Sequence, residues 1–159
     1  MKSFDSILIQ KINSSRKLLV TSHIYPDGDA AGSVMGLVRS LRLAGKNVDI
    51  AWFDGVGDRF DFLFEKEKIL TPQDLAPEYD SVIILDIGSE DRTGFANEIR
   101  NLACPIINID HHATNTGFAD YDHVDVEASS TCEVVFHLIR TAGWPIDASV
   151  GEPLYTGLE

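Results

Sequence analysis

The segment Ser81–Leu85, SVIIL, is an almost continuous apolar run that ends directly before Asp86. Similar runs occupy Lys17–Thr21 (KLLVT) and Pro105–Ile109 (PIINI), and Val48–Phe53 (VDIAWF) adds a fourth. Short apolar runs without polar alternation predict strands that are buried on both faces. We therefore place these four segments in a sheet whose two faces are both covered.

Segments with helical spacing of apolar residues lie between and after these strands. They cover residues 4–12, 30–44, 95–102, 131–141 and 148–155, while 54–79 is assigned to a short helix with loops and 111–130 to loop. Alternating strands and helices predict an α/β fold, a parallel β-sheet with helices on both faces. A length of 159 residues fits one domain.

Composition excludes several classes of protein. The formal net charge of −12 disfavours a binder of duplex DNA, which needs a basic face. Cys104 and Cys132 are far apart and form no CxxC pair, so neither a disulfide scaffold nor a thiolate zinc site is expected. No apolar run approaches the ~20 residues of a membrane span, and the N-terminus lacks the profile of a signal peptide. We expect a cytoplasmic protein with no membrane partner.

Acidic and histidine side chains follow three of the four strands. They are His23, Asp27 and Asp29 after the first strand, Asp86 after the third, and Asp110, His111 and His112 after the fourth. Ligands of open parallel sheets bind beyond the carboxyl ends of the strands, so these side chains are expected to converge. For Asp29 alone, capping of the helix that begins at Ala30 is the alternative role.

The chemistry of this set favours metal ions. Carboxylates and imidazoles without thiolates suit Mn²⁺, Mg²⁺, Fe²⁺ or Co²⁺ better than a structural zinc. More than four donors indicate two ions, which in such sites lie ~3.5–4 Å apart and act on a phosphoryl group from both sides. Asp86 is the candidate for the carboxylate shared by both ions. His112 would then be free to donate a proton or a hydrogen bond to an oxygen of the substrate.

Three segments resemble the motifs of a known family. Motifs I, II and III of the RecJ-like DHH phosphoesterase family resemble, in this order, SHIYPDGDAAGS (22–33), ILDIGSEDRTG (84–94) and NIDHHATN (108–115). The family's serine-rich helix start resembles EASSTCEVVFHLI (127–139). The form HxxPDGDAxGS is most similar to the nanoRNase/pAp-phosphatase group. The resemblance implies hydrolysis of short single-stranded RNA or of 3′-phosphoadenosine 5′-phosphate (pAp) by water activated between two metal ions.

The resemblance also implies a role for each matching residue. His23, Asp27 and Asp86 would hold one ion, and Asp29, Asp86 and His111 the other. Asp110 would support a neighbouring histidine, and His112 would face the phosphate. The implied cofactors are two divalent ions, with Mn²⁺ expected first and Mg²⁺ or Co²⁺ as alternatives.

The family's fourth motif is met only in part. Tyr155, Thr156 and Gly157 match its Tyr-Thr-Gly, but the Thr-Asp-Thr-Gly that follows in the family lies beyond Glu159. The family's C-terminal substrate domain is also not present in this sequence. We therefore expect residues 1–159 to be the N-terminal catalytic domain alone, to hold the first metal better than the second, and to hydrolyse little.

Several alternatives stay open from the sequence. The activity could instead be that of a cyclic-dinucleotide phosphodiesterase or a pyrophosphatase of the same family, or the chain could be a non-catalytic nucleotide-binding module; a homodimer is possible. Arg92 either binds a substrate phosphate or pairs with Glu90 or Asp91. His123 lies among acids, where a solvated loop is favoured over a second metal site. The aromatic residues Trp52, Phe60, Phe62 and Phe64 are favoured as packing groups over base-stacking ones.

Overall fold

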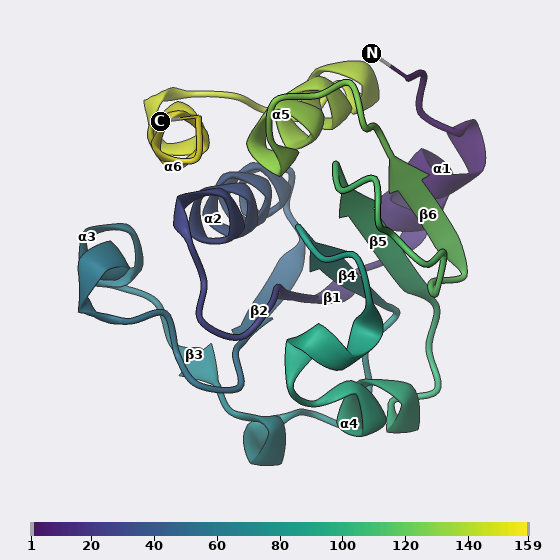
Figure 1. The fold of residues 1–159 in the computed structure, drawn as a ribbon, viewed down its shortest axis with the longest axis vertical. Helices are drawn as coiled ribbons and strands as arrows, with labels where there is room; N and C mark the ends of the chain where they lie inside the picture. The colour runs from purple at the N-terminus through teal and green to yellow at the C-terminus, as the bar shows by residue number, and fades with distance from the viewer. Residues whose placement is uncertain (1, 159) are drawn as a thin grey trace.

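The apolar segments form the central sheet in a computed structural model, which describes residues 2–158 (Figure 1). The strands are β1 (Lys17–Thr21), β2 (Asn47–Ala51), β3 (Ile69–Leu70), β4 (Ser81–Leu85), β5 (Ile106–Asp110) and β6 (Tyr121–Val124). Their order is β3-β2-β1-β4-β5-β6, and every neighbouring pair is parallel. The predicted parallel sheet is confirmed.

The strand order reverses direction between β1 and β4. The chain leaves β1 outward through β2 and β3, returns to pair β4 beside β1, and continues outward through β5 and β6. In sheets of this order, ligands bind at the carboxyl ends of the strands where the direction changes. The segment after β1 and the residue after β4, Asp86, lie at that point.

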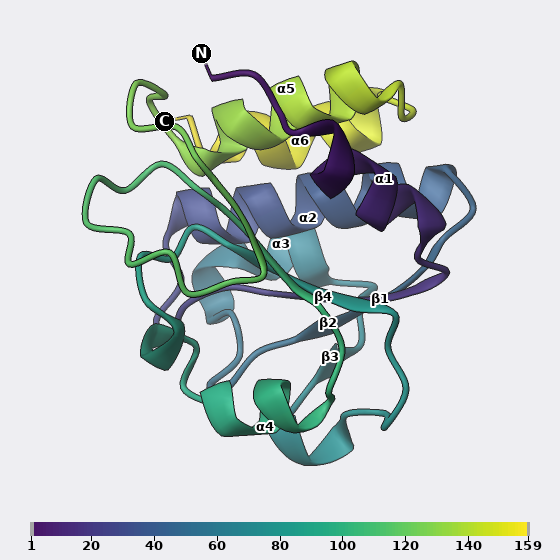
Figure 2. The ribbon, with the colours of Figure 1, turned by 90° about the vertical axis from the view of Figure 1, so that its right-hand side faces the viewer.

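Helices cover both faces of the sheet, as predicted. They are α1 (Ser6–Ser14), α2 (Gly28–Leu43), α3 (Asp61–Phe64), α4 (Ala96–Asn101), α5 (Thr131–Ala142) and α6 (Ala148–Thr156), with 3₁₀ turns at Asp58–Phe60, Pro72–Asp74 and Glu90–Thr93. Figure 2 shows α1, α2, α5 and α6 on one side of the sheet and α4 on the other. Alternate residues of β4 enter two separate cores, Ile83 with the first group of helices and Ile84 with α4. This arrangement explains why the strand sequences are apolar without alternation.

Three glycines of α2, spaced four residues apart at Gly28, Gly32 and Gly36, let α6 approach α2 closely. A methyl group at Gly32 would overlap the carbonyl oxygen of Pro153, and one at Gly36 would overlap the side chain of Leu154. At the end of α6, a methyl group on Gly157 would lie 2.9 Å from the carbonyl oxygen of Gly28. The close packing therefore brings the last residues of α6 next to the start of α2.

The structure differs from the predicted elements mainly at the sheet edges. β3 and β6 were not predicted, because β3 is two residues long and β6 (YDHV) carries polar residues that suggest a loop. The prediction of a solvated acidic loop around His123 is wrong. His123 lies in β6, is 2% exposed, and stacks on Phe4 with 3.9 Å between the ring centroids.

Smaller differences concern the helix starts and the aromatic residues. α1 begins at Ser6 rather than at residue 4, because the Asp5 carboxylate accepts the N–H of Ile7 and caps the helix. Trp52, Phe60 and Phe64 are buried in the core, as predicted for packing groups, whereas Phe62 is 58% exposed and is not part of the core. None of the helices in residues 2–158 has the length and apolar character needed to cross a membrane.

Candidate metal centre

Asp86 lies at the centre of the site, immediately after β4. Its backbone is left-handed (φ 58°), a conformation that aspartate tolerates better than most residues, and its N–H donates to the carbonyl oxygen of Ile109 at 3.0 Å. The residue is 1% exposed. The hydroxyl of Thr131, at the start of α5, donates to Asp86 Oδ1 at 2.9 Å. The carboxylate is therefore fixed in a single position between the ends of β1 and β5.

His23 and Asp27 approach Asp86 from the loop after β1. His23 Nε2 lies 3.6 Å from Asp86 Oδ2 and 4.0 Å from Asp27 Oδ1. His23 Nδ1 is 2.8 Å from the carbonyl oxygen of Ile24, which can only accept, so Nδ1 carries a proton and Nε2 is the ring nitrogen directed at the acids. Trp52 Nε1 donates to the His23 carbonyl oxygen at 2.7 Å and holds this backbone in place.

Asp29 and His111 form the opposite side of the site. His111 Nε2 lies 3.6 Å from Asp29 Oδ2 and 3.7 Å from Asp86 Oδ1. The two oxygens of Asp29 accept the N–H groups of Thr131 (2.7 Å) and Cys132 (2.8 Å) in the first turn of α5. The N-terminus of α5 thus orients this carboxylate through two backbone donors.

The alternative role for Asp29, capping of α2, is not what the structure shows. The helix begins at Gly28, and Asp27 is its cap, with Oδ1 accepting the N–H groups of Asp29 and Ala30 at 3.0 Å each. Asp27 therefore caps α2 with one oxygen and keeps lone pairs for a further contact. The sequence did not distinguish these two acids, because each precedes a helical pattern by a residue or two.

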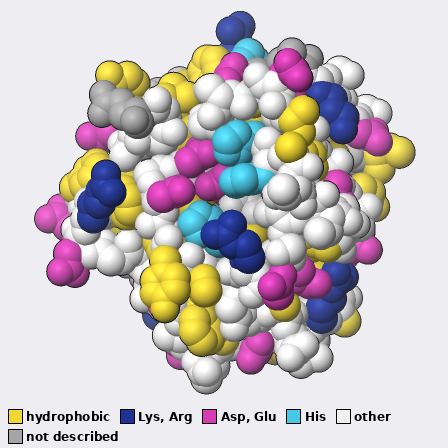
Figure 3. All heavy atoms as spheres, in the orientation of Figure 1, with side chains coloured by type: hydrophobic (Ala, Val, Ile, Leu, Met, Phe, Trp, Pro, Cys, Tyr) yellow, Lys and Arg dark blue, Asp and Glu magenta, His cyan; other side chains and the backbone are white. Residues whose placement is uncertain are grey.

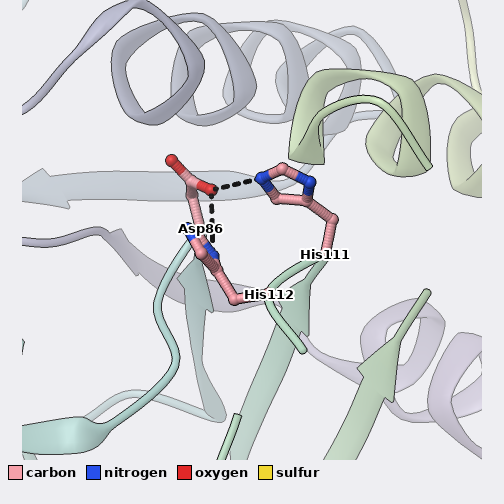
Figure 4. Close-up of side chains that lie close together, drawn as sticks. All are labelled: Asp86, His111 and His112. Atoms are coloured by element: carbon pink, nitrogen blue, oxygen red, sulfur yellow. Dashed lines mark ion pairs between the residues drawn. The ribbon is translucent and has the colours of Figure 1, made fainter. Parts of the chain in front are cut away.

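Asp110 and His112 form a tight pair beside Asp86. Asp110 is fully buried, its Oδ1 lies 2.7 Å from His112 Nδ1, and its Oδ2 accepts the side-chain amide of Asn115 at 2.7 Å. His112 Nδ1 is also 3.7 Å from Asp86 Oδ1. In Figure 4 both histidine rings point toward the Asp86 carboxylate from the end of β5. Because Nδ1 of His112 is engaged with Asp110, the ring nitrogen left for another partner is Nε2.

The pKa values of the cluster reflect several carboxylates that lie close together with histidines beside them. Burial, followed by the charge of Asp86, raises the pKa of Asp29 to about 6. Burial also acts to raise the pKa of Asp86, but hydrogen bonds from His23 and Thr131 and the nearby histidines outweigh it, and the pKa is lowered. Desolvation opposes protonation of His23, yet contacts with Asp86 and with the Ile24 carbonyl raise its pKa.

The donor set fits a divalent cation at two overlapping positions. Within residues 2–158, one group of donors that lie within 4.8 Å of one another is His23, Asp27 and Asp86, and a second is Asp86, His111 and His112. Asp86 belongs to both groups. Only histidines form ion pairs with these acids in the described part of the chain, so no lysine or arginine competes with a cation.

Arg92 is an exposed residue of the turn Glu90–Thr93, at the same edge of the sheet. Its carbonyl oxygen accepts the N–H of Ile24 at 2.9 Å, which ties this turn to the loop after β1. Glu90 pairs with Arg100 at 2.6 Å, so the pairing of Glu90 with Arg92 considered above is not formed. Among the described residues Arg92 has no ion-pair partner. Figure 3 shows the acidic and histidine side chains gathered on this face, with a basic side chain next to them.

Thr131 is a residue of the site that the sequence does not predict as one. The segment Ser129–Thr131 is predicted to cap α5, and Ser130 does so, with Oγ accepting the N–H of Glu133 at 3.1 Å. Thr131 instead contacts both Asp86 and Asp29. These partners are 45 and 102 residues away, so no local pattern indicates them.

The fold and the site define an α/β protein with a carboxylate–histidine centre at the point where the strand order reverses. The model of the DHH family, N-terminal domain, matches residues 17–158, and the chain belongs to this family. The resemblance stated from the sequence is thereby confirmed.

Relatives and solved structures agree with this assignment. The chain is 31% identical to the bifunctional oligoribonuclease and PAP phosphatase NrnA of Thermus thermophilus over 89% of its own length and 42% of the relative. It is 25% identical to the protein of the same name from Bacillus subtilis over 95% of this chain and 48% of the relative. An exopolyphosphatase-related protein from Bacteroides fragilis superposes with a TM-score of 0.90 at 28% identity, covering 99% of this chain and 51% of that one. The chain spans about half the length of the relatives it matches.

Proposed function

We propose that this chain is the catalytic half of a metal-dependent phosphoesterase that hydrolyses short oligoribonucleotides, pAp, or both. The observation that carries the proposal is the position of Asp86, a buried carboxylate that belongs to two overlapping groups of metal donors. The names of the relatives from Thermus thermophilus and Bacillus subtilis support the substrate class. The exopolyphosphatase-related neighbour supports phosphate chemistry of the same general kind.

The proposed cofactors are two divalent ions. His23, Asp27 and Asp86 would hold the first, and Asp29, Asp86 and His111 the second. In this second set Asp29, whose Oδ2 lies 3.6 Å from His111 Nε2, takes the place that His112 has in the observed donor group, because His112 Nδ1 is engaged with Asp110. Mixed carboxylate and imidazole ligands favour Mn²⁺, with Mg²⁺ and Co²⁺ as alternatives. Such a pair, when bound, lowers the pKa of a water molecule and offsets the negative charge that develops at phosphorus.

His112 and Asp110 have a separate task in this proposal. The Asp110 carboxylate fixes the proton on His112 Nδ1 and stabilises the ring when it is positively charged, as a buried acid does for a catalytic histidine. A protonated His112 then donates from Nε2 to a phosphoryl or leaving oxygen. Arg92, which has no ion-pair partner among the described residues, is proposed to bind a phosphate of the substrate.

The remainder of the active protein is proposed to come from further chain. The relatives from Thermus thermophilus and Bacillus subtilis are about twice as long as the matched region. Gly157 lies against the backbone of Gly28 and Asp29, on the side where the second ion is proposed. We therefore propose that residues 1–159 alone hold the first ion better than the second and hydrolyse pAp or a diribonucleotide very slowly.

Competition for the Mn²⁺-loaded chain tests the substrate class. Fluorescent pAp is displaced by unlabelled pAp, a diribonucleotide, pyrophosphate or cyclic di-AMP, and the four inhibition constants are compared. The proposal predicts that pAp or the diribonucleotide competes best and that no competitor acts in the Asp86→Asn variant. Tightest binding of pyrophosphate or of cyclic di-AMP would replace the proposed substrate with that of the corresponding family alternative. Nucleotide binding that does not require Mn²⁺ would favour a non-catalytic module.

A further inference from the structure

A cavity of about 430 Å³ opens beside the candidate metal centre, on the side of β2. Its walls are the loop after β1, which contributes Tyr25, Pro26 and Asp27, and residues 54–60 after β2. Asp27 therefore belongs both to the metal centre and to this cavity. A molecule that occupies the cavity would be in direct continuity with a phosphate bound at the metal centre.

We propose that this cavity binds the base and ribose of a nucleotide whose phosphate lies at the metal centre, and that Tyr25 is the stacking surface for the base. The proposal rests on the phosphoesterase function proposed above and adds to it the position of the nucleoside. Its occupant is a nucleoside, not a second phosphate.

Tyr25 is held in an unusual backbone conformation with its residue surface exposed. This residue is 81% exposed, and its backbone adopts the left-handed conformation (φ 54°) that is unfavourable for a residue of this size. Two hydrogen bonds hold this backbone: the Tyr25 N–H donates to Asp54 Oδ2 at 3.0 Å, and the adjacent Ile24 N–H donates to the Arg92 carbonyl oxygen at 2.9 Å. The fold thus holds an unfavourable backbone conformation that leaves a flat ring uncovered, an arrangement typical of functional positions.

The residues that line the cavity carry more negative than positive charge. Asp27, Asp54 and Asp58 line it, against the single basic residue Arg59. These carboxylates repel a phosphate but accept hydrogen bonds from ribose hydroxyls and from the amino groups of bases. Asp54 uses Oδ2 for the Tyr25 N–H, while Oδ1 has no partner among residues 2–158. With cations bound at the metal centre, the phosphate is therefore favoured there and the uncharged nucleoside in the cavity.

Binding of two matched ligands to the Mn²⁺-loaded chain tests this proposal. AMP and ribose 5-phosphate carry the same phosphate and sugar and differ only in the base. Stacking of a base on an aromatic side chain predicts that AMP binds about tenfold more tightly, as measured by isothermal titration calorimetry. Tyr25→Ala should reduce this ratio to about one, Tyr25→Phe should keep it, and neither should change the dissociation constant of Mn²⁺.

Phe62→Ala is the matched control, because Phe62 is an exposed aromatic residue on α3 that does not line the cavity. It should leave the ratio at about ten. Equal affinity of the wild-type chain for the two ligands, or a ratio unchanged by Tyr25→Ala, would overturn the base cavity and leave the phosphoesterase proposal intact. Conversely, Tyr25-dependent AMP binding that persists in Asp86→Asn without Mn²⁺ would support the cavity and contradict the proposed function.

Discussion

Two regions of this protein have nearly the same composition and entirely different architecture. The strand-end cluster consists of His23, Asp27, Asp29, Asp86, Asp110, His111 and His112, and the β6 cluster consists of Asp120, Asp122, His123 and Asp125. The strand-end cluster is assembled from the ends of β1, β4 and β5, whereas the β6 cluster comes from one strand and its flanks. Only the strand-end cluster yields groups of three mutually close metal donors in the described part of the chain.

The side chains of the β6 cluster form hydrogen bonds and a ring contact that hold neighbouring parts of the fold together. Asp120 Oδ2 accepts the N–H of Ile106 at 2.8 Å, and Asp125 Oδ2 accepts the N–H of Lys2 at 2.6 Å. Asp122 accepts from Asn108 and from the N–H of Ala119, and His123 stacks on Phe4. The acids of this strand therefore bind backbone and side-chain donors of their own neighbourhood.

Convergence of donors from separate strands, and not acid and histidine content, distinguishes the strand-end cluster from the β6 cluster. In a strand, successive side chains point to opposite faces, so neighbours such as Asp122 and His123 cannot share one ion. In the strand-end cluster, histidine Nδ1 atoms are held by carbonyl or carboxylate groups, so His23 and His111 direct Nε2 toward Asp86.

Asp86→Asn should abolish the response to Mn²⁺. A ligand at one hundred times its dissociation constant stabilises the folded state by about 2.7 kcal/mol, which raises the melting temperature of a chain of this size by about 5–10 °C. The variant should show a shift below about 1 °C in a thermal melt, because both donor groups lose their shared carboxylate.

Asp122→Asn is the matched control for that experiment. Asp122 is also an aspartate, and burial raises its pKa. It lies in the outermost strand, β6, and belongs to the β6 cluster. It should keep the full Mn²⁺ shift. A shift that disappears in Asp122→Asn and survives in Asp86→Asn would reverse the roles assigned to the two clusters.

Thr131→Val should weaken Mn²⁺ binding by about tenfold. The substitution removes the hydroxyl that donates to Asp86 and retains the backbone N–H that donates to Asp29, and loss of such a supporting hydrogen bond typically costs 10–100-fold in metal affinity. Calorimetric titration measures the dissociation constant. Thr141→Val, an exposed position on the same helix, should have no effect, and equal losses in both variants would attribute the change to α5 as a whole.

His123→Leu should leave the Mn²⁺ shift unchanged and alter the response to pH. Burial, followed by the charge of Lys2, lowers the pKa of His123 to about 4 from an ordinary value of 6.5. Below pH 6.5 the unfolded chain therefore binds a proton that the folded chain does not, and the free energy of unfolding falls as the pH drops from about 6.5 to about 4. The variant should lack this destabilisation, which amounts to about 3 kcal/mol at pH 4. Identical pH profiles of wild type and variant, from chemical denaturation, would contradict the burial assigned to this ring.

The sequence predicts β1, β4 and β5 because their apolar runs are long enough to indicate strands buried on both faces. It does not predict β6, since Tyr121–Val124 contains two polar residues and is stabilised by pairing with β5. The strand-end residues were predicted as a group because parallel strands deliver their carboxyl ends to one edge. The contact of Thr131 with Asp86 was beyond prediction, because it depends on how α5 packs across the sheet.

The sequence shows the spacing of Gly28, Gly32 and Gly36, but it does not show which helix packs against these glycines. Only the structure shows that α6 lies against this face and that Gly157 is placed beside the start of α2. Likewise, the assignment of Asp27 as the cap of α2 and of Asp29 as the acceptor for α5 follows from the position of α5 and not from either local pattern.

Anomalous diffraction from crystals of the chain soaked in Mn²⁺ tests the convergence of the three strand ends most directly. We predict a first peak bounded by His23, Asp27 and Asp86 and, at higher Mn²⁺ concentration, a second peak ~3.5–4 Å away beside Asp29 and His111. Peaks confined to the β6 cluster, or no peak in contact with Asp86, would contradict the account.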